Sequence, residues 1–200
     1  MSELNIQSVT YPLIIITPCS RPENLQKLYE SIQFDKITVW LIIYDTRHEN
    51  VPFIKQFDKE TILHHSKIIE LECKEEGIAG HQIRNIALNI IMHGLIYFLD
   101  DDNIIHPFFW HICTHFKQNT INTFNLLYTT GNVRVGNNPT EHNIDTAQYV
   151  FDKSLVGDIL FDVNNYSADG AFINSLCENN KEKVFHYNYI AAYYNWLRKG

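Results

Sequence analysis

Three consecutive aspartates, Asp100, Asp101 and Asp102, follow directly on the apolar run 95–99. Such a run predicts a buried strand of a parallel sheet, and open α/β sheets bind their ligands outside the carboxyl ends of the strands. Three like charges at one point repel one another unless a cation lies among them. Mg²⁺ and Mn²⁺ prefer carboxylate oxygens, and Mg²⁺ commonly adds substrate phosphates to one or two carboxylates. The triplet therefore indicates a cation and phosphate site, the alternative being a solvated acidic turn.

The segments around this triplet alternate between strand and helix patterns. Strands are expected over 12–18, 37–44, 67–73, 95–99, 126–130, 132–135, 147–151 and 184–187, and helices over about 21–33, 81–93, 106–118 and 169–177. Ser20-Arg21-Pro22-Glu23 is a capping-box pattern for the first helix. The segment 49–66 is irregular, and we expect a short helix or loop there. The alternation predicts an α/β fold with a mixed, mostly parallel central sheet flanked by helices.

Composition limits the classes of partner. The chain has 200 residues, which fits a single domain, with 45% hydrophobic and 20% charged residues. Its net charge of −7 argues against nucleic-acid binding, which needs a basic surface. An anionic ligand must therefore be held by a local device, namely a metal, a helix N-terminus or a well-placed arginine.

The cysteines and the hydropathy pattern bear on location. Cys19, Cys73, Cys113 and Cys177 form no C-x-x-C pair, so reduced thiols in the cytoplasm are expected. The first residues lack the basic and apolar regions of a signal peptide. No apolar run approaches the ~20 residues of a membrane span. We expect a cytoplasmic protein with no membrane span of its own.

A small-residue loop precedes the helix that leads to the acidic strand end. The loop is Gly77-Ile78-Ala79-Gly80, and the start of the following helix offers N–H groups to an anion. Arg84 lies one turn into that helix, on the side of the acidic residues. It is expected to clamp Asp100 or a diphosphate, the alternative being a surface pair with a glutamate.

These motifs, taken in order, resemble those of a known group of enzymes. Residues 77–88 and 97–103 resemble the RN-x-AL … DxD signature of nucleotide-sugar glycosyltransferases with the GT-A fold. Residues 16–23 and 40–45 are similar to the inverting β-1,3-glucuronyltransferase family, and family-2-type transferases share the broader pattern. The resemblance implies one GT-A domain, with a nucleotide-sugar-binding half at about 10–110 and an acceptor-binding half at about 111–200.

The resemblance also implies roles for individual residues. Asp102 matches the position that binds the metal, Mn²⁺ or Mg²⁺, which neutralises charge on the leaving diphosphate. Asp45 matches an aspartate that hydrogen-bonds the base, and Asp100 and Asp101 match contacts to the sugar or ribose. The expected donor-binding positions are Thr17, Pro18, Asp45, Arg84, Asp100 and Asp101.

Two short matches lie in the second half. Inverting transfer needs a carboxylate to deprotonate the acceptor hydroxyl, and Asp169 stands where family-2-type enzymes have this base, the alternative being a plain N-cap. The glucuronyltransferases use a later glutamate, for which Glu178 and Glu182 are the nearby candidates. His186 matches a histidine that GT-A enzymes present to the diphosphate or metal, the alternative being a structural or surface residue.

The expected activity is inverting, metal-dependent transfer of a sugar from a nucleoside-diphosphate sugar to a hydroxyl acceptor such as a glycan. UDP is the first candidate for the nucleoside diphosphate. Cys19-Ser20 replaces the tyrosine that stacks on the base in the family, so base and sugar can differ. The aromatic residues after position 186 are expected to dock a C-terminal helix, or to stack on the acceptor. The alternatives are a sugar-1-phosphate nucleotidyltransferase and a catalytically silent nucleotide-sugar- or glycan-binding module.

Overall fold

A nine-stranded mixed sheet forms the centre of the protein, whose computed structural model describes residues 11–48, 52–53, 65–74 and 76–198. The strands are β1 (Leu13–Cys19), β2 (Val39–Asp45), β3 (Ile68–Cys73), β4 (Leu95–Phe98), β5 (Ile104–Ile105), β6 (Ile121–Tyr128), β7 (Val133–Arg134), β8 (Tyr149–Asp152) and β9 (Val184–Tyr194). Their order is β3-β2-β1-β4-β8-β6-β9-β5, with β7 paired to β6. The α-helices are α1 (Leu25–Ser31), α3 (His81–Ile90), α4 (Pro107–Ile112) and α5 (Ala168–Asn179). Short 3-10 helices lie at Pro22–Asn24, His65–Lys67, Cys113–His115, Thr146–Gln148, Lys153–Leu155 and Lys181–Lys183.

The first half of the sheet is parallel. β1 lies between β2 and β4, and β3 extends the sheet beyond β2. Ile15, Ile42 and Ile96 are fully buried because helices cover both faces here, which explains the continuous apolar runs in the sequence. The carboxyl ends of β1, β2 and β4 consequently meet at one edge.

The second half is mixed, as predicted. β8 runs antiparallel to both β4 and β6, whereas β9 runs parallel to β6 over its whole length. The prediction of a C-terminal helix was wrong, because residues 184–194 form one long strand instead. β9 passes a register irregularity near Asn125 of β6, and its end returns to the carboxyl edge of the first half.

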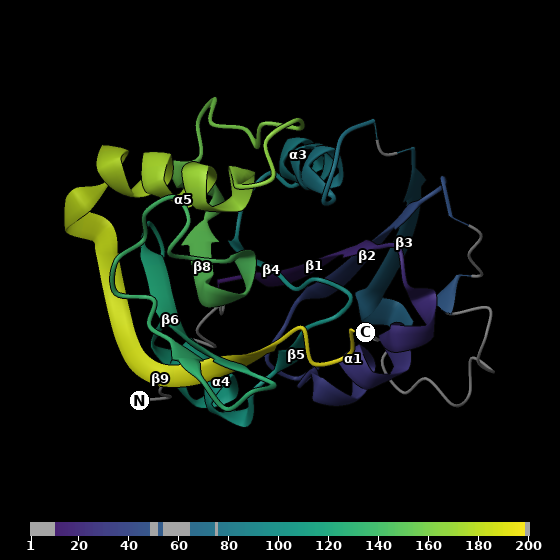
Figure 1. The fold of residues 1–200 in the computed structure, drawn as a ribbon, viewed down its shortest axis with the longest axis horizontal. Coiled ribbons are helices and arrows are strands. Elements are labelled where there is room, and N and C mark those ends of the chain that lie inside the picture. Colours follow the sequence, from purple (N-terminus) through teal and green to yellow (C-terminus); the bar gives the residue numbers. More distant parts are fainter. Residues whose placement is uncertain (1–10, 49–51, 54–64, 75, 199–200) are drawn as a thin grey trace, which may run out of the picture.

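Two hydrophobic layers hold the sheet between helices. One layer packs Leu28 of α1 and Phe109 of α4 against Trp40 and Tyr97. The other layer packs α3 and α5 against the opposite face (Figure 1). The sheet thus forms a fixed platform whose carboxyl edge is open between the two helical layers.

Several helix ends differ from the sequence-based expectations. Ser20 does not cap the first helix, because its hydroxyl donates to Asp101 and the N-cap Arg21 makes no side-chain cap hydrogen bond. The third predicted helix ends at Ile112 and continues as one 3-10 turn. Most of the segment 49–66 lies outside the described residues. Among those described, no helix is long and apolar enough to cross a membrane.

Candidate functional site

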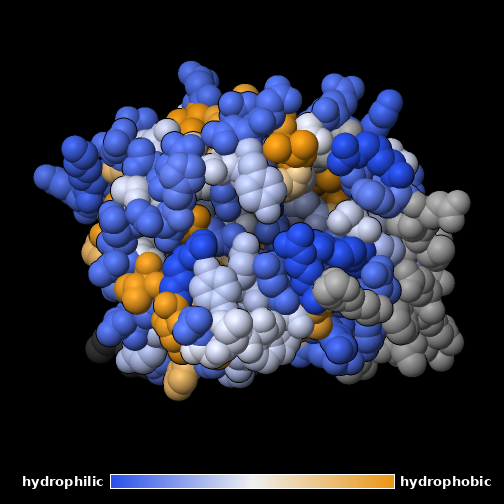
Figure 2. Space-filling model, viewed as in Figure 1, coloured by the Kyte–Doolittle hydropathy of each residue, from blue (hydrophilic) through white to orange (hydrophobic). Residues whose placement is uncertain are grey.

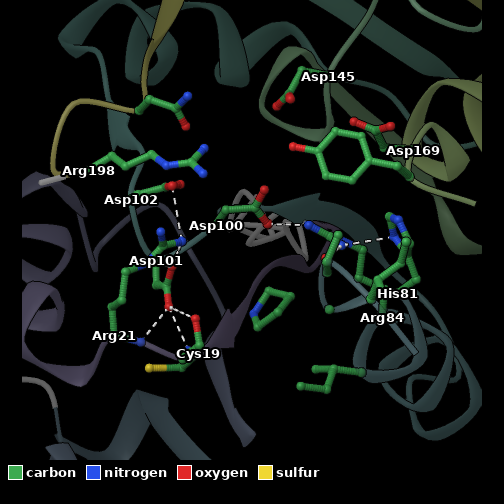
Figure 3. A pocket seen from close by; sticks show the side chains of 18 of the residues that line it. Cys19, Arg21, His81, Arg84, Asp100, Asp101, Asp102, Asp145, Asp169 and Arg198 are labelled. Carbon is green, nitrogen blue, oxygen red and sulfur yellow. Dashed lines mark hydrogen bonds and ion pairs between the residues drawn. The ribbon is translucent and has the colours of Figure 1, made fainter. Parts of the chain in front are cut away.

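A cavity of about 680 Å³ opens at the carboxyl edge of β1, β2 and β4. Figure 2 shows the molecule hollowed near its middle, with mainly hydrophilic residues around the hollow. One wall comes from the loops after these strands and from the start of α3, and includes Pro18, Arg21, Asp45, Ile78, Arg84 and Asp100–Asp102. The facing wall comes from the second half and includes Arg134, His142, Asp145, Tyr166, Asp169 and Tyr194, whereas Arg198 lies beside Asp102 (Figure 3). The cavity therefore joins the two halves of the chain.

Asp101 connects the end of β4 to the loop after β1. Its carboxylate accepts hydrogen bonds from the backbone N–H groups of Ser20 (2.6 Å) and Arg21 (2.7 Å), and from the Arg21 guanidinium, whose Nε lies at 2.8 Å. Asn24 adds a bond from its side chain to the Asp101 carbonyl, at 2.9 Å. Asp101 is 1% exposed, so these partners replace its lost hydration. Its oxygens hold the loop after β1 against the end of β4.

Asp100 is held from two sides. The guanidinium of Arg84 forms an ion pair with it, and Thr146 donates its hydroxyl to the other carboxylate oxygen at 3.2 Å. Arg84 is itself buried, donates to the carbonyl of Ala79 at 2.5 Å, and lies over the rings of Phe98 and Phe161. The Arg84 side chain thus fixes Asp100 at the cavity wall, in the direction that its place in the helix indicated.

Of the three aspartates, Asp102 has the fewest hydrogen bonds and ion pairs to offset its buried negative charge. It lies 3.0 Å from the Arg21 guanidinium, and burial together with the charge of Asp100 raises its pKa to about 6. A buried carboxylate repelled by its neighbours suits a bound cation. Among the described residues, no group of three or more His, Cys, Asp or Glu is arranged to hold a metal. A metal at Asp102 would therefore take its other ligands from substrate phosphates and water, as Mg²⁺ commonly does.

A second pair of carboxylates lies on the facing wall (Figure 3). Asp145 caps the 3-10 helix Thr146–Gln148, accepting from the N–H of Ala147 at 2.9 Å. Burial and the charges of Asp169 and Asp100 raise its pKa to about 7. Burial also raises the pKa of Asp169, although the charge of Arg84 acts in the opposite direction. Both groups therefore hold or release a proton closer to neutral pH than ordinary aspartates do.

The remaining donor positions expected from the first half lie at the carboxyl edge. Asp45 is buried and binds Arg47, with Nη2 at 2.7 Å, while His48 lies 3.6 Å away. Pro18 lines the cavity. The Thr17 side chain points into the core instead, where its hydroxyl accepts from Trp40 at 2.9 Å. The structure therefore brings Pro18 and Asp45 together with the aspartate triplet.

The candidates in the second half separate into two groups. Asp169 lines the cavity in the first turn of α5, and Ser167, not Asp169, is the N-cap of that helix. Glu178 and Glu182 do not line the cavity. His186 lies outside it as well, where its Nδ1 hydrogen-bonds the Thr123 hydroxyl at 3.1 Å. The opposite end of β9 reaches the cavity.

Several cavity residues had no predicted role. They are Arg21, His81, Arg134, Asp145 and Arg198. Asp145 begins a D-x-x-Q capping box, which marks a helix start in the sequence but gives no sign of a nearby cavity. His81 stacks on Phe161, and burial lowers its pKa to about 4, so it stays neutral beside Arg84. Arg134 and Arg198 belonged to no motif of the sequence.

This chain resembles known proteins in its structure. No protein-family model and no curated protein sequence matches it. The crystal structure of S. aureus TarS 1-349 in complex with UDP has a TM-score of 0.66 at 14% identity, covering 91% of this chain and 60% of that one. The mannosyltransferase PcManGT from Pyrobaculum calidifontis, in complex with GDP-Man and Mn²⁺, has a TM-score of 0.64 at 12% identity, covering 96% and 59%. The chain thus spans about 60% of TarS 1-349 and of PcManGT, and 36% of the longer TarS crystal structure. The likeness confirms the predicted GT-A fold.

Arg21→Gln tests the Asp101 connection. The substitution removes the guanidinium from a buried carboxylate that keeps its backbone donors, so we expect unfolding to become easier by about 2 kcal/mol. Chemical denaturation measures this change. Lys27→Gln removes the same charge from an exposed position of α1 and serves as the control. Equal effects of both substitutions would contradict the assignment.

Asp145→Asn tests whether the buried negative charge of Asp145 destabilises the folded protein. The pKa of Asp145 is about 7 in the folded protein, above its ordinary value of 3.8. At a pH between these two values, the folded protein keeps a proton on Asp145 that the unfolded chain has lost. Stability conferred by this group is therefore lost as pH rises through that window. Asparagine keeps the cap without the charge. We expect the variant to gain at least about 1 kcal/mol over the wild type at about pH 8, and less at about pH 5.

Thermal unfolding at the two pH values measures this difference. Asp158→Asn, at an exposed loop position, is the matched control and should show no such pH-dependent gain. A variant less stable than the wild type at the higher pH would show that the charge of Asp145 does not destabilise the folded protein.

Proposed function

We propose that this protein is an inverting, metal-dependent glycosyltransferase. It moves a sugar from a nucleoside-diphosphate sugar to a hydroxyl acceptor such as a glycan, and UDP is the first candidate for the nucleoside diphosphate. The observation that carries the proposal is that one cavity holds both Asp102, in the loop after β4, and Asp169 of the second half (Figure 3). The GT-A fold supports it, since the similar structures are complexes with UDP, UDP-GlcNAc and GDP-Man with Mn²⁺.

The first-half wall suits a nucleotide diphosphate. Asp102 would hold Mn²⁺ or Mg²⁺ together with the diphosphate, and the bound metal would neutralise charge on the leaving group. Asp100, fixed by Arg84 and Thr146, faces the sugar or ribose. Arg198, whose guanidinium points toward Asp102, supplies a further positive charge (Figure 3). In this arrangement Arg198 provides what was expected of His186.

The nucleoside end of the donor would lie along the same wall. The backbone at Pro18 and the side chain of Asp45 border this part of the cavity and would contact the base. Asp101 contributes indirectly, because its bonds to Ser20 and Arg21 fix the loop that follows Pro18. Its expected contact with the sugar or ribose is therefore replaced by a positioning role.

Asp169 is the proposed general base. The acceptor oxygen attacks the anomeric carbon, the bond from that carbon to the diphosphate breaks, and the hydroxyl proton passes to the Asp169 carboxylate. Attack opposite the leaving group inverts the configuration. The raised pKa of Asp169 brings its proton affinity toward working pH, which favours this transfer. Glu178 and Glu182, the other candidates, lie outside the cavity.

A thermal-shift panel tests donor binding. UDP, GDP, ADP and CDP and their common sugars are each added with Mn²⁺ or with a chelator. A ligand that binds the folded state raises its apparent stability by RT ln(1 + [L]/Kd). We expect stabilisation by one nucleotide family only with metal, and its loss in Asp102→Asn. Asp158→Asn should behave as the wild type. Absence of any nucleotide effect would refute the proposed function.

Asp169→Asn separates transfer from donor binding. Removal of a general base is expected to lower turnover by about 10²–10⁴-fold, because no carboxylate then accepts the acceptor proton. The affinity for the nucleotide found in the panel should remain. Release of nucleoside diphosphate from the donor, with and without candidate acceptors, measures turnover. Glu178→Gln is the control and should retain turnover. Donor binding without any turnover in the wild type would instead favour a silent binding module.

A further inference from the structure

Five arginines line the cavity, and they fall into two groups. Arg21, Arg47 and Arg84 each form an ion pair with an aspartate of the first-half wall. Arg134 and Arg198 have no carboxylate within 4.0 Å among the described residues. A cation that faces a cavity without an internal partner is available to an anionic ligand.

Arg134 is nevertheless held in a defined position. It lies in β7, whose pairing places it opposite Leu126 of β6, and its carbonyl accepts from Gln148 at 3.3 Å. Its guanidinium lies 5.5 Å from the ring centre of Tyr128 and 5.9 Å from that of Tyr194. Such contacts hold the guanidinium near the ring faces, and the N–H groups along its edge remain able to bind a carboxylate or phosphate.

Arg134 contacts Tyr128 and Tyr194 and, among the described residues, forms no ion pair with the aspartates of the first-half wall. The metal position at Asp102 and the neighbouring Arg198 already account for the charge of the diphosphate. Arg134 comes from the second half of the chain, together with the proposed base Asp169. Tyr194, which lines the same cavity, lies beside Arg134, with its ring centre 5.9 Å from the guanidinium. Arg134 therefore belongs to the part of the cavity left for the acceptor.

We infer that the acceptor carries an anionic group, a phosphate or a carboxylate, which binds the edge of Arg134. This inference rests on the proposed function and narrows its acceptor to charged glycans, sugar phosphates or polyol phosphates. The paired donors of a guanidinium match two oxygens of either group, so Arg134 also orients the acceptor hydroxyl toward Asp169. The net charge of −7 makes such a local cation necessary, because the chain as a whole repels anions.

The test titrates small acceptor mimics into the protein already loaded with diamagnetic Mg²⁺ and the nucleoside diphosphate found in the panel. Glycerol 3-phosphate represents phosphate acceptors, glucuronate represents carboxylate acceptors, and glycerol and glucose are their neutral counterparts. The arginine Nε–H signals are followed by NMR, and the Arg134 signal is identified by its absence in Arg134→Lys and, where it folds, in Arg134→Gln. We expect this signal to shift with one or both anions and not with the neutral compounds.

Variants give the affinity change. Arg134→Gln should weaken anion binding by about tenfold or more, while Arg134→Lys, which keeps the charge, restores part of it. Lys181→Gln removes an exposed charge outside the cavity and should leave binding unchanged. Because Arg134→Lys and the wild-type titration do not depend on folding of the glutamine variant, the test stands if that variant unfolds.

The outcomes separate this inference from the proposed function. Equal binding of neutral and anionic mimics, an unmoved Arg134 signal, or unchanged affinity in Arg134→Gln would overturn the anionic acceptor while leaving donor binding intact. Failure of every nucleotide to bind would overturn the proposed function. The same titration on the unloaded protein would then show whether Arg134 binds anions.

Discussion

The buried carboxylate of Asp101 is the constraint on which the site depends. A buried aspartate is costly unless its oxygens are paired, and here Ser20 and Arg21 supply the pairs. This connection draws the loop after β1 onto the end of β4 and also brings Arg21 within reach of Asp102. Asp100 is compensated separately by Arg84. Three consecutive aspartates are thus tolerated because each turns toward a different environment and two arginines share their charge.

The parallel half of the fold could be predicted because strands that are buried on both faces appear in the sequence as continuous apolar runs. The apolar runs around Ile15, Ile42 and Ile96 are of that kind. The second half shows no such pattern. In β9 the exposed Phe185 and Tyr189 stand near the buried Ala191, and its pairing to β6 is irregular, so neither periodicity nor length marks it as one strand. Long-range pairing, not local preference, decided that segment.

The same distinction applies to the cavity. Asp45 and Asp100 could be located because topology brings the carboxyl ends of neighbouring parallel strands together, whatever the details of packing. Thr17 lies only one residue before Pro18, yet its side chain faces Trp40 in the core, since successive strand residues alternate between faces. His186 lies at the wrong end of a strand whose full length the sequence did not indicate. Asp145 and Arg134 reach the cavity through tertiary contacts alone.

The two carboxylates on the facing wall give the site a further property. Asp145 and Asp169 repel one another and are buried, so their ionisations are coupled and the pair prefers a state with one proton. Burial is the largest effect on the pKa of both groups, but the charge of Arg84 is the strongest effect opposing it at Asp169 and the weakest of the stated effects at Asp145. The proton therefore belongs preferentially on Asp145, leaving Asp169 ionised and ready to accept another. On this argument Asp145 positions charge for Asp169 without touching the acceptor, and Arg84 of the first-half wall sets which carboxylate carries the reaction.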